Sequence, residues 1–123
     1  MLLSEIMKVH VVSATLESTV AEIIGLMDLY QISHVPIIDS RSTPVGVITV
    51  DSIARNLIDG QFKSKLSKLM TDSQFTLDEN CSVDEAEKLL QGNQLRRLCV
   101  TSDGKLVGTV GWVELCQVRI SEQ

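Results

Sequence analysis

The residues best suited to acid–base, nucleophilic or metal chemistry are few in this chain of 123 residues, which holds two histidines and three cysteines. His10 and His34 stand far apart, and neither lies near a cysteine in the sequence. The three cysteines are widely spaced and form no C-x-x-C pair, so no zinc site is predicted. The sequence also lacks the G-x-x-x-x-G-K-[ST] and H-E-x-x-H motifs. We therefore expect no catalytic activity, no metal, and reduced, buried thiols at Cys81, Cys99 and Cys116.

Composition and charge exclude further classes of function. Hydrophobic residues make up 44% of the chain and aromatic residues only 3%, so the core must be aliphatic. The net charge of −5 disfavours binding to nucleic acid, which requires clustered Lys and Arg. No apolar run of the sequence approaches the ~20 residues that cross a bilayer. Residues 1–5 are too short and too acidic to be a signal peptide. We expect a cytoplasmic protein with no membrane insertion.

One pattern occurs twice along the chain. Residues 3–7 (LSEIM) return as residues 66–70 (LSKLM), at an offset of 66 − 3 = 63. After a loop loses one residue, residues 45–46 correspond to residues 107–108 at an offset of 62. A repeat of this length is one supersecondary unit that needs a partner to bury its apolar face. The sequence therefore predicts two motifs, 1–60 and 61–123, packed as a pseudo-two-fold pair with a ligand cleft between them.

Each repeat has the pattern strand, helix, strand, strand, helix. In the first repeat Thr19 and Glu22 form a capping box ahead of an amphipathic stripe, and Gly60 is the expected C-cap of the second helix. The first repeat is predicted to hold strands at 9–12, 34–38 and 45–49, and helices starting at Thr19 and spanning 51–59.

The second repeat predicts the same order of elements. Ser82 and Glu85 form the second capping box, and Asp103 with Gly104 marks a turn between two strands. The apolar strands indicate sheets covered by helices, an α+β (mixed α/β) class. The predicted elements are strands at 75–77, 97–101 and 106–110, helices starting at Ser82 and spanning 112–118, and a partly helical link at 61–69.

Two stretches in each repeat resemble a known motif. They are residues 33–39 (SHVPIID) and 44–53 (PVGVITVDSI) in the first repeat, and 95–100 (LRRLCV) and 104–110 (GKLVGTV) in the second. Each copy resembles a CBS motif, and the pair resembles a Bateman module over nearly the whole chain. The resemblance implies tandem β-α-β-β-α motifs that sense an adenine nucleotide, namely AMP, ADP or ATP, or S-adenosylmethionine. It also implies that no cofactor is required and that the ligand regulates an effector protein.

The family's stretch for polar recognition occurs unequally in the two copies. Thr49 corresponds to the contact with phosphate or ribose at a helix start, where N–H groups and the helix dipole favour an anion; its alternative role is the N-cap. Ser52 stands where Asp is commoner and would bind ribose less strongly, while the adjacent Asp51 points about 100° away around the helix. The second copy has Gly111 and Glu114 instead. We expect that site to be weak, altered or empty, with Glu114 either a ligand contact or a solvated carboxylate.

The resemblance also assigns basic residues to the phosphates. The relevant position holds His34 in the first copy and Arg97 in the second, with Arg96 beside it. Arg suits phosphate because its planar fork bonds two oxygens. The alternatives are a solvated strand edge for each Arg and a structural role for His34.

An adenine ring would require an apolar slot. The candidates in the first copy are Met7 and Val9, together with Ile6 and the backbone near Val35 and Pro36, and Met70 takes the corresponding place in the second copy. Core packing is the alternative for these side chains, and it is the role expected for Val9.

Two functions follow from these predictions. The first is a nucleotide-sensing regulatory module, and the second is a ligand-free scaffold for dimerisation and protein interaction, favoured by the altered second copy. The resemblance implies a homodimer, with candidate contacts at Leu57, Ile58, Leu115 and Val118.

Overall fold

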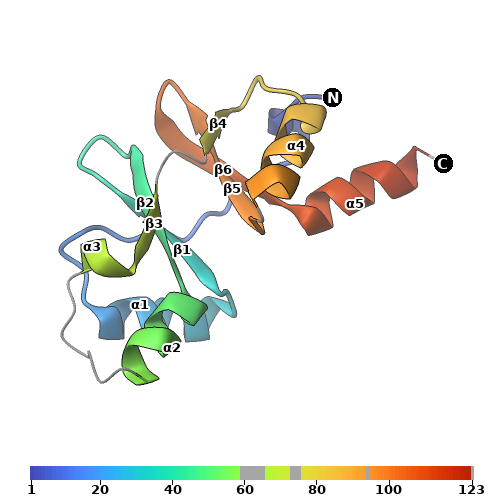
Figure 1. The fold of residues 1–123 in the computed structure, drawn as a ribbon. Coiled ribbons are helices and arrows are strands. Elements are labelled where there is room, and N and C mark those ends of the chain that lie inside the picture. Colours follow the sequence, from blue (N-terminus) through green and yellow to red (C-terminus); the bar gives the residue numbers. More distant parts are fainter. Residues whose placement is uncertain (59–65, 73–75, 94, 123) are drawn as a thin grey trace. The chain divides into compact units, whose positions relative to one another are not determined.

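The chain divides into two compact units in a computed structural model that describes residues 1–58, 66–72, 76–93 and 95–122 (Figure 1). The central unit is Val12–Ser73, and the split unit combines Met1–Val11 with Gln74–Gln123. These spatial units differ from the sequence repeats, because the first residues of the chain belong with its second half. The division into motifs 1–60 and 61–123 stays a prediction about the repeat.

The central unit is a three-stranded antiparallel sheet, in the order β1-β2-β3, with helices packed against it. Helix α1 contacts β1 and α2, and α2 contacts β2 and the short helix α3 (Figure 1). Its elements are α1 (Val20–Tyr30), β1 (His34–Ile38), β2 (Pro44–Thr49), α2 (Val50–Ile58), α3 (Leu66–Leu69) and β3 (Met70–Asp72).

Aliphatic side chains hold the central unit together, as the composition predicts. Every second residue of β2 is buried, which is the period of a strand with one face on a core. Burial of these side chains is the main stabilising term, at roughly 1.5–3 kcal/mol for each large one. The buried cluster consists of Ala14, Ile23, Met27, Val35, Ile37, Ile48, Ile53, Leu66 and Leu69.

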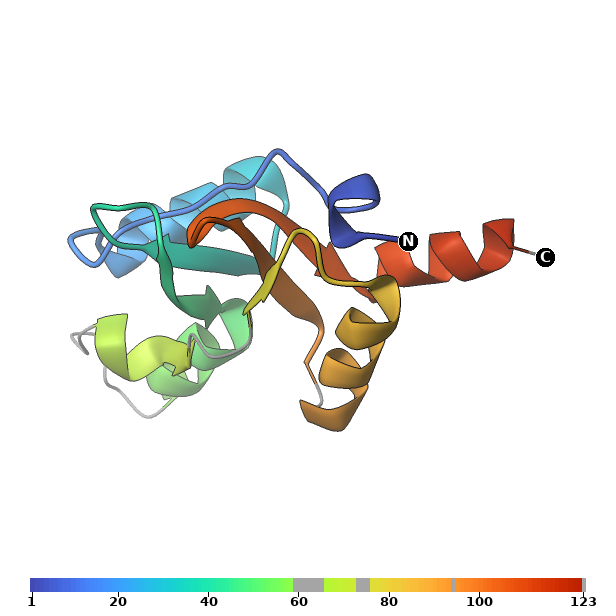
Figure 2. The same ribbon diagram turned by 90° about the horizontal axis from the view of Figure 1, so that it is seen from above.

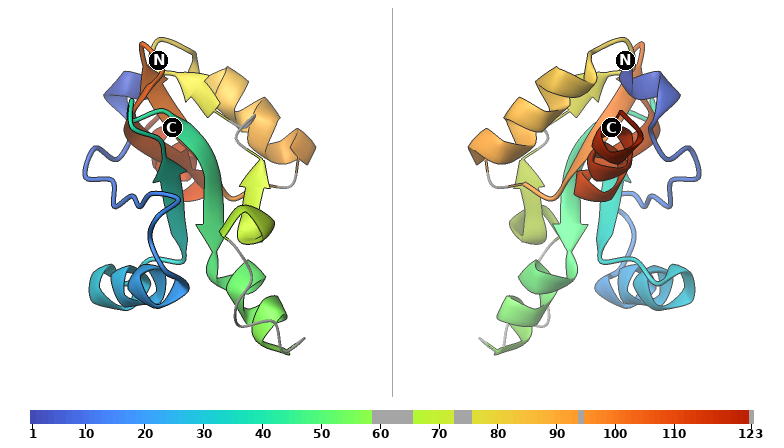
Figure 3. Two further views of the ribbon diagram at one scale, coloured as in Figure 1. Left: turned by 90° about the vertical axis from the view of Figure 1, so that its left-hand side faces the viewer. Right: turned by 90° about the vertical axis from the view of Figure 1, so that its right-hand side faces the viewer.

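The split unit has a sheet in the order β4-β5-β6, in which β4 runs parallel to β5 and β6 antiparallel to it. The predicted turn between β5 and β6 is present: Asp103 and Gly104 both have positive φ, at 51° and 79°, as a tight hairpin requires. In Figure 3, α5 is seen nearly end-on while α4 lies across the view. The elements are η1 (Leu3–Glu5), β4 (Thr76–Asp78), α4 (Val83–Asn93), β5 (Arg97–Ser102), β6 (Lys105–Gly111) and α5 (Trp112–Ser121).

The amino-terminal segment completes the split unit. The backbone N–H of Leu3 donates to the carbonyl of Cys81 at 2.9 Å, and Lys8 pairs with Thr109 of β6. Figure 2 shows this segment, in blue, beside the loop that leads into α4. Leu3 is fully buried in a cluster with Val83, Ala86, Leu90, Leu98, Val100, Val110 and Leu115.

The two units repeat each other in strand register. Val47 pairs with Thr71 in the central unit, and Thr109 pairs with Lys8 in the split unit, at offsets of 109 − 47 = 62 and 71 − 8 = 63. The parallel bridge of Ala14 to Ile37 likewise corresponds to the pairing of β4 with β5. The predicted duplication is therefore confirmed. The opening segment of each repeat completes the sheet of the other repeat.

Most predicted elements are confirmed, but the strand at 9–12 is wrong. Within the described residues, pairing near this segment is confined to single bridges at Lys8 and Ala14, which belong to different units. The segment between them joins the two units and has no strand partner along its length. Gly60, residues 61–65 and Phe75 lie outside the described residues.

Both helix N-caps have the predicted hydrogen bond. The N–H of Glu22 donates to Thr19 Oγ1, and the N–H of Glu85 donates to Ser82 Oγ, each at 3.1 Å. These bonds satisfy one of the free amide groups at the start of α1 and of α4.

The candidate dimer contacts divide into two groups. Leu57 and Ile58 on α2 are 47% and 85% exposed, which suits a contact surface. Leu115 and Val118 on α5 are buried inside the split unit, so their prediction as dimer contacts is wrong. They occupy the core-facing stripe of α5, and the period of the stripe alone does not distinguish a core from an interface.

The cysteines follow the prediction of burial only in part. Cys99 is buried on β5, and burial raises the pKa of its thiol to about 11. Cys81 is half-buried, and desolvation is the main cause that raises its pKa. Cys116 is exposed on α5, so the expectation of a buried thiol is wrong there. Among the described residues, no helix is long and apolar enough to span a bilayer.

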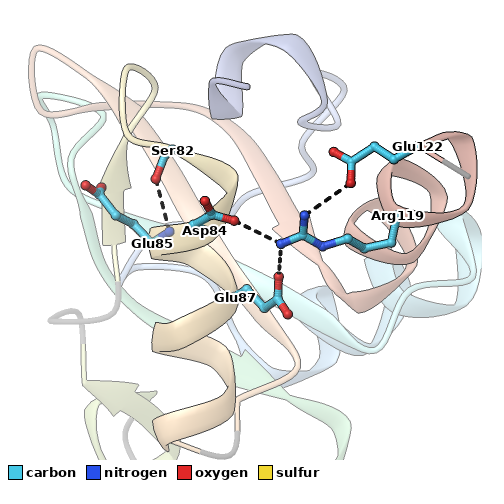
Figure 4. A network of polar contacts seen from close by, with 6 residues as sticks. All are labelled: Ser82, Asp84, Glu85, Glu87, Arg119 and Glu122. Atoms are coloured by element: carbon cyan, nitrogen blue, oxygen red, sulfur yellow. Dashed lines mark hydrogen bonds and ion pairs between the residues drawn. The ribbon is translucent and has the colours of Figure 1, made fainter.

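Arg119 ties α5 to α4 at the surface of the split unit. Its guanidinium binds Asp84 at 2.9 Å and Glu87 at 2.5 Å on α4, and Glu122 at 3.3 Å (Figure 4). The bonds to these carboxylates, with Glu87 first, raise the pKa of Arg119. Because the network is exposed, we expect it to orient α5 more than to stabilise the unit.

Candidate functional site: two strand–helix junctions

The central junction is the point where β2 ends at Thr49 and α2 begins. The N–H of Ser52 donates to Thr49 Oγ1 at 3.2 Å, and Ser52 Oγ donates to the Thr49 carbonyl at 2.9 Å. The N–H of Val50 donates to the Ser33 carbonyl at 3.0 Å. Thr49 thus has the N-cap role, and its contact with a ligand stays a prediction.

The hydroxyl groups of the central junction are half-buried and uncharged. Thr49 and Ser52 both retain part of their surface in solvent. A hydroxyl that donates one hydrogen bond still has lone pairs that accept others, so Ser52 Oγ remains able to accept. Asp51, the third predicted residue of this stretch, is exposed on α2.

His34 lies directly across the sheet from Thr49. The two residues are Cα partners in the pairing of β1 with β2. His34 Nδ1 lies 2.8 Å from Ser33 Oγ, so the ring is held at the start of β1. The next residues, Val35 and Pro36, are buried, and the Pro36 carbonyl accepts from the N–H of Ala14 at 3.0 Å. The structure therefore brings His34, Thr49 and Ser52 together at one end of the sheet.

The split junction is the equivalent point where β6 ends at Gly111 and α5 begins. Arg97 and Gly111 are Cα partners, as His34 and Thr49 are in the central unit. Here Glu114 Oε1 accepts from the N–H of Gly111 at 2.9 Å and from Arg97 Nη2 at 2.8 Å. Glu114 is only 4% exposed, so the alternative of a solvated carboxylate is wrong.

Arg97 is bound within its own unit. Besides Glu114, its Nη2 donates to Thr109 Oγ1 at 3.0 Å, and the side chain is 27% exposed. The alternative of a fully solvated strand edge is therefore wrong for Arg97, whereas Arg96 is exposed. A charged pair this buried is costly to break, because one charge would be left without its partner.

Gly111 permits this arrangement through its lack of a side chain. A Cβ atom there would lie 2.8 Å from the Arg96 carbonyl oxygen and 3.1 Å from Arg97 Nη1. Its φ of −138° is an ordinary extended conformation that any residue adopts. Glycine is required here because Arg96 and Arg97 lie too close to leave room for a Cβ atom. The threonine found at the equivalent position of the central junction does not fit here.

The predicted apolar slot combines residues of both units. Met7 belongs to the split unit, where it packs on the core and lies over Gly108, as Met70 lies over Gly46 in the central unit. Val9 is 59% exposed, so its expected packing in the core is wrong. Val35 and Pro36 belong to the central unit, and an adenine slot formed with them stays a prediction.

Sequence reasoning missed the polar network of the split junction. The sequence did contain a signal for it. Gly111 and Glu114 both differ from the Thr and Asp of the family motif, and Arg97 corresponds to His34 of the first copy. The role of Thr109 as a further partner of Arg97 had no signal in the sequence, because it depends on how the arginine folds back along β6.

These paired junctions, at equivalent positions of two repeats, define a tandem-repeat module with one potential site in each repeat. The family model for the CBS domain matches residues 3–59 and 66–119, which is most of the chain. The chain therefore belongs to the CBS domain family.

Curated relatives include inosine-5'-monophosphate dehydrogenases from staphylococci. The chain is 37% identical over 99 residues to the enzyme of Staphylococcus saprophyticus, a match that covers 78% of this chain and 20% of that enzyme. The Staphylococcus aureus enzyme (strain Mu50) is 35% identical over the same length and coverage. The chain thus spans about a fifth of the length of these relatives.

Solved structures of CBS pairs have the same fold. The CBS domain pair of protein MJ0100, in complex with 5'-methylthioadenosine and S-adenosyl-L-methionine, superimposes with a TM-score of 0.89 at 22% identity, covering 100% of this chain and 98% of that one. CBSX2 in complex with AMP gives a TM-score of 0.83 at 22% identity, with 98% and 97% covered. A putative acetoin utilization protein (AcuB) from Vibrio cholerae gives 0.84 at 18% identity, with 99% and 92% covered. At these identities the likeness establishes the fold.

Proposed function

We propose that this chain is a non-catalytic regulatory module that binds an adenine-containing nucleotide at the central junction. The ligand is AMP, ADP or ATP, or S-adenosylmethionine. The observation that carries the proposal is the pair of half-buried hydroxyls, Thr49 and Ser52, at the start of the nine-residue helix α2. Asp51, the acidic residue in the first turn of this helix, is exposed.

The chemistry of the central junction suits a phosphate or a ribose. The amino-terminal end of α2 has a positive partial charge, which favours an anion. The oxygen of Ser52 can accept a hydrogen bond from a ribose hydroxyl, and His34 is the cross-strand partner of Thr49. The complexes of MJ0100 and CBSX2 with adenosine compounds support this choice of ligand class.

A thermal-shift experiment with each candidate ligand tests the proposal. A ligand at 100 times its Kd adds about 2.7 kcal/mol to the free energy of unfolding. We expect a rise in Tm with at least one of the named ligands, and its loss in Thr49→Val. Thr43→Val, the same chemical change in the β1–β2 loop, is the matched control and should retain the rise. A Tm unaffected by all four ligands would contradict the proposal.

Regulation requires that the ligand distinguish two states of the protein. A ligand shifts an equilibrium only by its differential affinity for the two states. We propose that these are two arrangements of a homodimer that acts on an effector protein. The exposed Leu57 and Ile58 support a contact surface on α2. Light scattering with and without ligand measures the assembly, and a monomer under both conditions would contradict this part.

The second candidate function is a ligand-free interaction scaffold. The observation that favours it is the split junction, whose Arg97 and Glu114 bind each other. This function predicts no Tm shift with any of the four ligands and a dimer that persists in Thr49→Val.

A further inference from the structure

A carboxylate, that of Glu114, caps the start of α5, whereas the hydroxyl of Thr49 caps the start of α2. Its side chain turns back so that Oε1 accepts from the N–H of Gly111 at 2.9 Å. The residue is buried to all but 4% of its surface, and its second oxygen, Oε2, is buried without a hydrogen-bond partner among the described residues. A full negative charge thus lies at the positive end of this ten-residue helix.

The nearby cation is bound to the same carboxylate. Arg97 Nη2 donates both to Glu114 Oε1 and to Thr109 Oγ1, at 2.8 Å and 3.0 Å. The side chain of Arg97 reaches this place by crossing the face of Gly111, where a Cβ would lie 3.3 Å from its Cγ. The helix start and the guanidinium are the two groups that would receive a phosphate, and Glu114 neutralises both.

An incoming phosphate would meet acceptors in place of donors. Oε2 of Glu114 is an acceptor only, and a carboxylate next to a phosphate is a like-charge contact. To bind there, the phosphate would have to displace Glu114 from Arg97, and displacement leaves a buried carboxylate without its charged partner. At the central junction the equivalent residue is Ser52, which has no charge.

We propose that Glu114 is a specificity-determining residue that closes the split junction to phosphate-bearing ligands. The chain then binds one phosphate-bearing nucleotide, at the central junction, and not two. The identity of that nucleotide rests on the proposed function, whereas the closing of the split junction does not. The unpartnered Oε2 supports the inference because it marks the carboxylate as held in place by Arg97 and the helix start alone.

Two-dimensional ¹⁵N NMR on the whole chain tests the proposal, with inorganic phosphate and AMP as separate probes. In the native protein we expect the Gly111 amide signal not to move in a saturable way with either probe. In Glu114→Ser, which places the central-junction residue in the split junction, we expect a saturable shift of Gly111. The Kd of Glu114→Ser for phosphate at the split junction should be at least about tenfold lower than that of the native protein. This is the change expected for about 1.4 kcal/mol of lost repulsion.

Two further variants keep the result decisive. Glu114→Gln removes the charge but keeps the shape, so it tests the proposal if the serine variant does not fold, and it should also admit phosphate. Glu85→Ser removes the same charge from an exposed position on α4 and should behave like the native protein. Saturable binding at Gly111 in the native protein, or none in either Glu114 variant, would overturn the inference.

The same spectra separate this inference from the proposed function. AMP-dependent shifts at Thr49 and Ser52 report on the central junction, and shifts at Gly111 report on the split junction. If the first are missing while Glu114→Ser gains phosphate binding at Gly111, the proposed function fails and the role of Glu114 stands.

Discussion

The central and split junctions have the same backbone and opposite chemistry. In each, a β-strand residue faces its cross-strand partner just before a helix begins: Thr49 with His34, and Gly111 with Arg97. The helix start is capped by hydroxyl groups at the central junction and by a carboxylate paired with an arginine at the split junction. The two units therefore share apolar cores built on the same plan, while the polar residues at their junctions differ. A repeat in sequence predicts equivalent places and does not predict equivalent functions.

The largest effect is expected from removing a buried leucine from the segment that opens each repeat. Residues 1–11 open the first repeat but belong to the split unit, and residues 66–72 open the second repeat but belong to the central unit. Leu3→Ala removes a fully buried side chain from the split core, and we expect a loss of about 2–5 kcal/mol. Hydrogen exchange should show β5 and β6 losing protection while β1 and β2 keep theirs. The equivalent variant Leu66→Ala should have the reverse pattern, because Leu66 belongs to the central core. Loss of protection in the same unit for both variants would contradict the comparison.

The second prediction concerns the ion pair of the split junction. Arg97→Ala leaves Glu114 buried with the Gly111 N–H as its remaining described donor, and we expect a loss of about 2–3 kcal/mol in urea unfolding. Removing both side chains in Arg97→Ala/Glu114→Ala should restore part of that loss, which a double-mutant cycle measures as coupling. Additive losses would mean that the two side chains act independently.

The third prediction tests whether the split junction lacks room for a side chain at position 111. Gly111→Ala places a Cβ 2.8 Å from the Arg96 carbonyl oxygen, so the backbone must shift, at a cost of about 1–3 kcal/mol. Gly92→Ala is the matched control, because nothing lies within 4 Å of its Cβ position on α4. That control should gain stability, at roughly 0.5–1 kcal/mol, from better helix propensity. Equal unfolding free energies for the two variants would remove the steric argument.

The smallest effect is expected at the surface network of the split unit. Arg119→Ala breaks three exposed ion pairs, and we expect a change in Tm well below that of Arg97→Ala. The difference from the native protein should shrink further in high salt, since exposed charges are screened. A loss of stability as large as that of Arg97→Ala would show that the greater burial of Arg97 does not make its ion pair the stronger one.

Much of the fold was predictable because it depends on local patterns. The capping residues Thr19 and Ser82 and the turn at Asp103 each act on their own neighbours in the chain. The repeat offset also predicted which positions would be equivalent. The strand expected at 9–12 failed because pairing depends on distant partners, and those of Lys8 and Ala14 lie in different units.

The candidate site was less predictable than the fold. Sequence reasoning marked Gly111 and Glu114 as departures but left Glu114 open between ligand contact and solvent. Whether a carboxylate is buried depends on what folds over it, and here Arg97 crosses the missing side chain of Gly111. Leu115 and Val118 were misassigned for a related reason, since an apolar helix stripe suits a core and an interface equally.

The exchange of opening segments has a consequence for synthesis on the ribosome. The central unit is complete once residue 73 has emerged, whereas residues 1–11 have no sheet to join until β6 has been made. At roughly 5–20 residues per second, Leu3 is made several seconds before the β6 strand of its own unit. Residues 1–11 are thus made before the central unit but complete their native contacts after it.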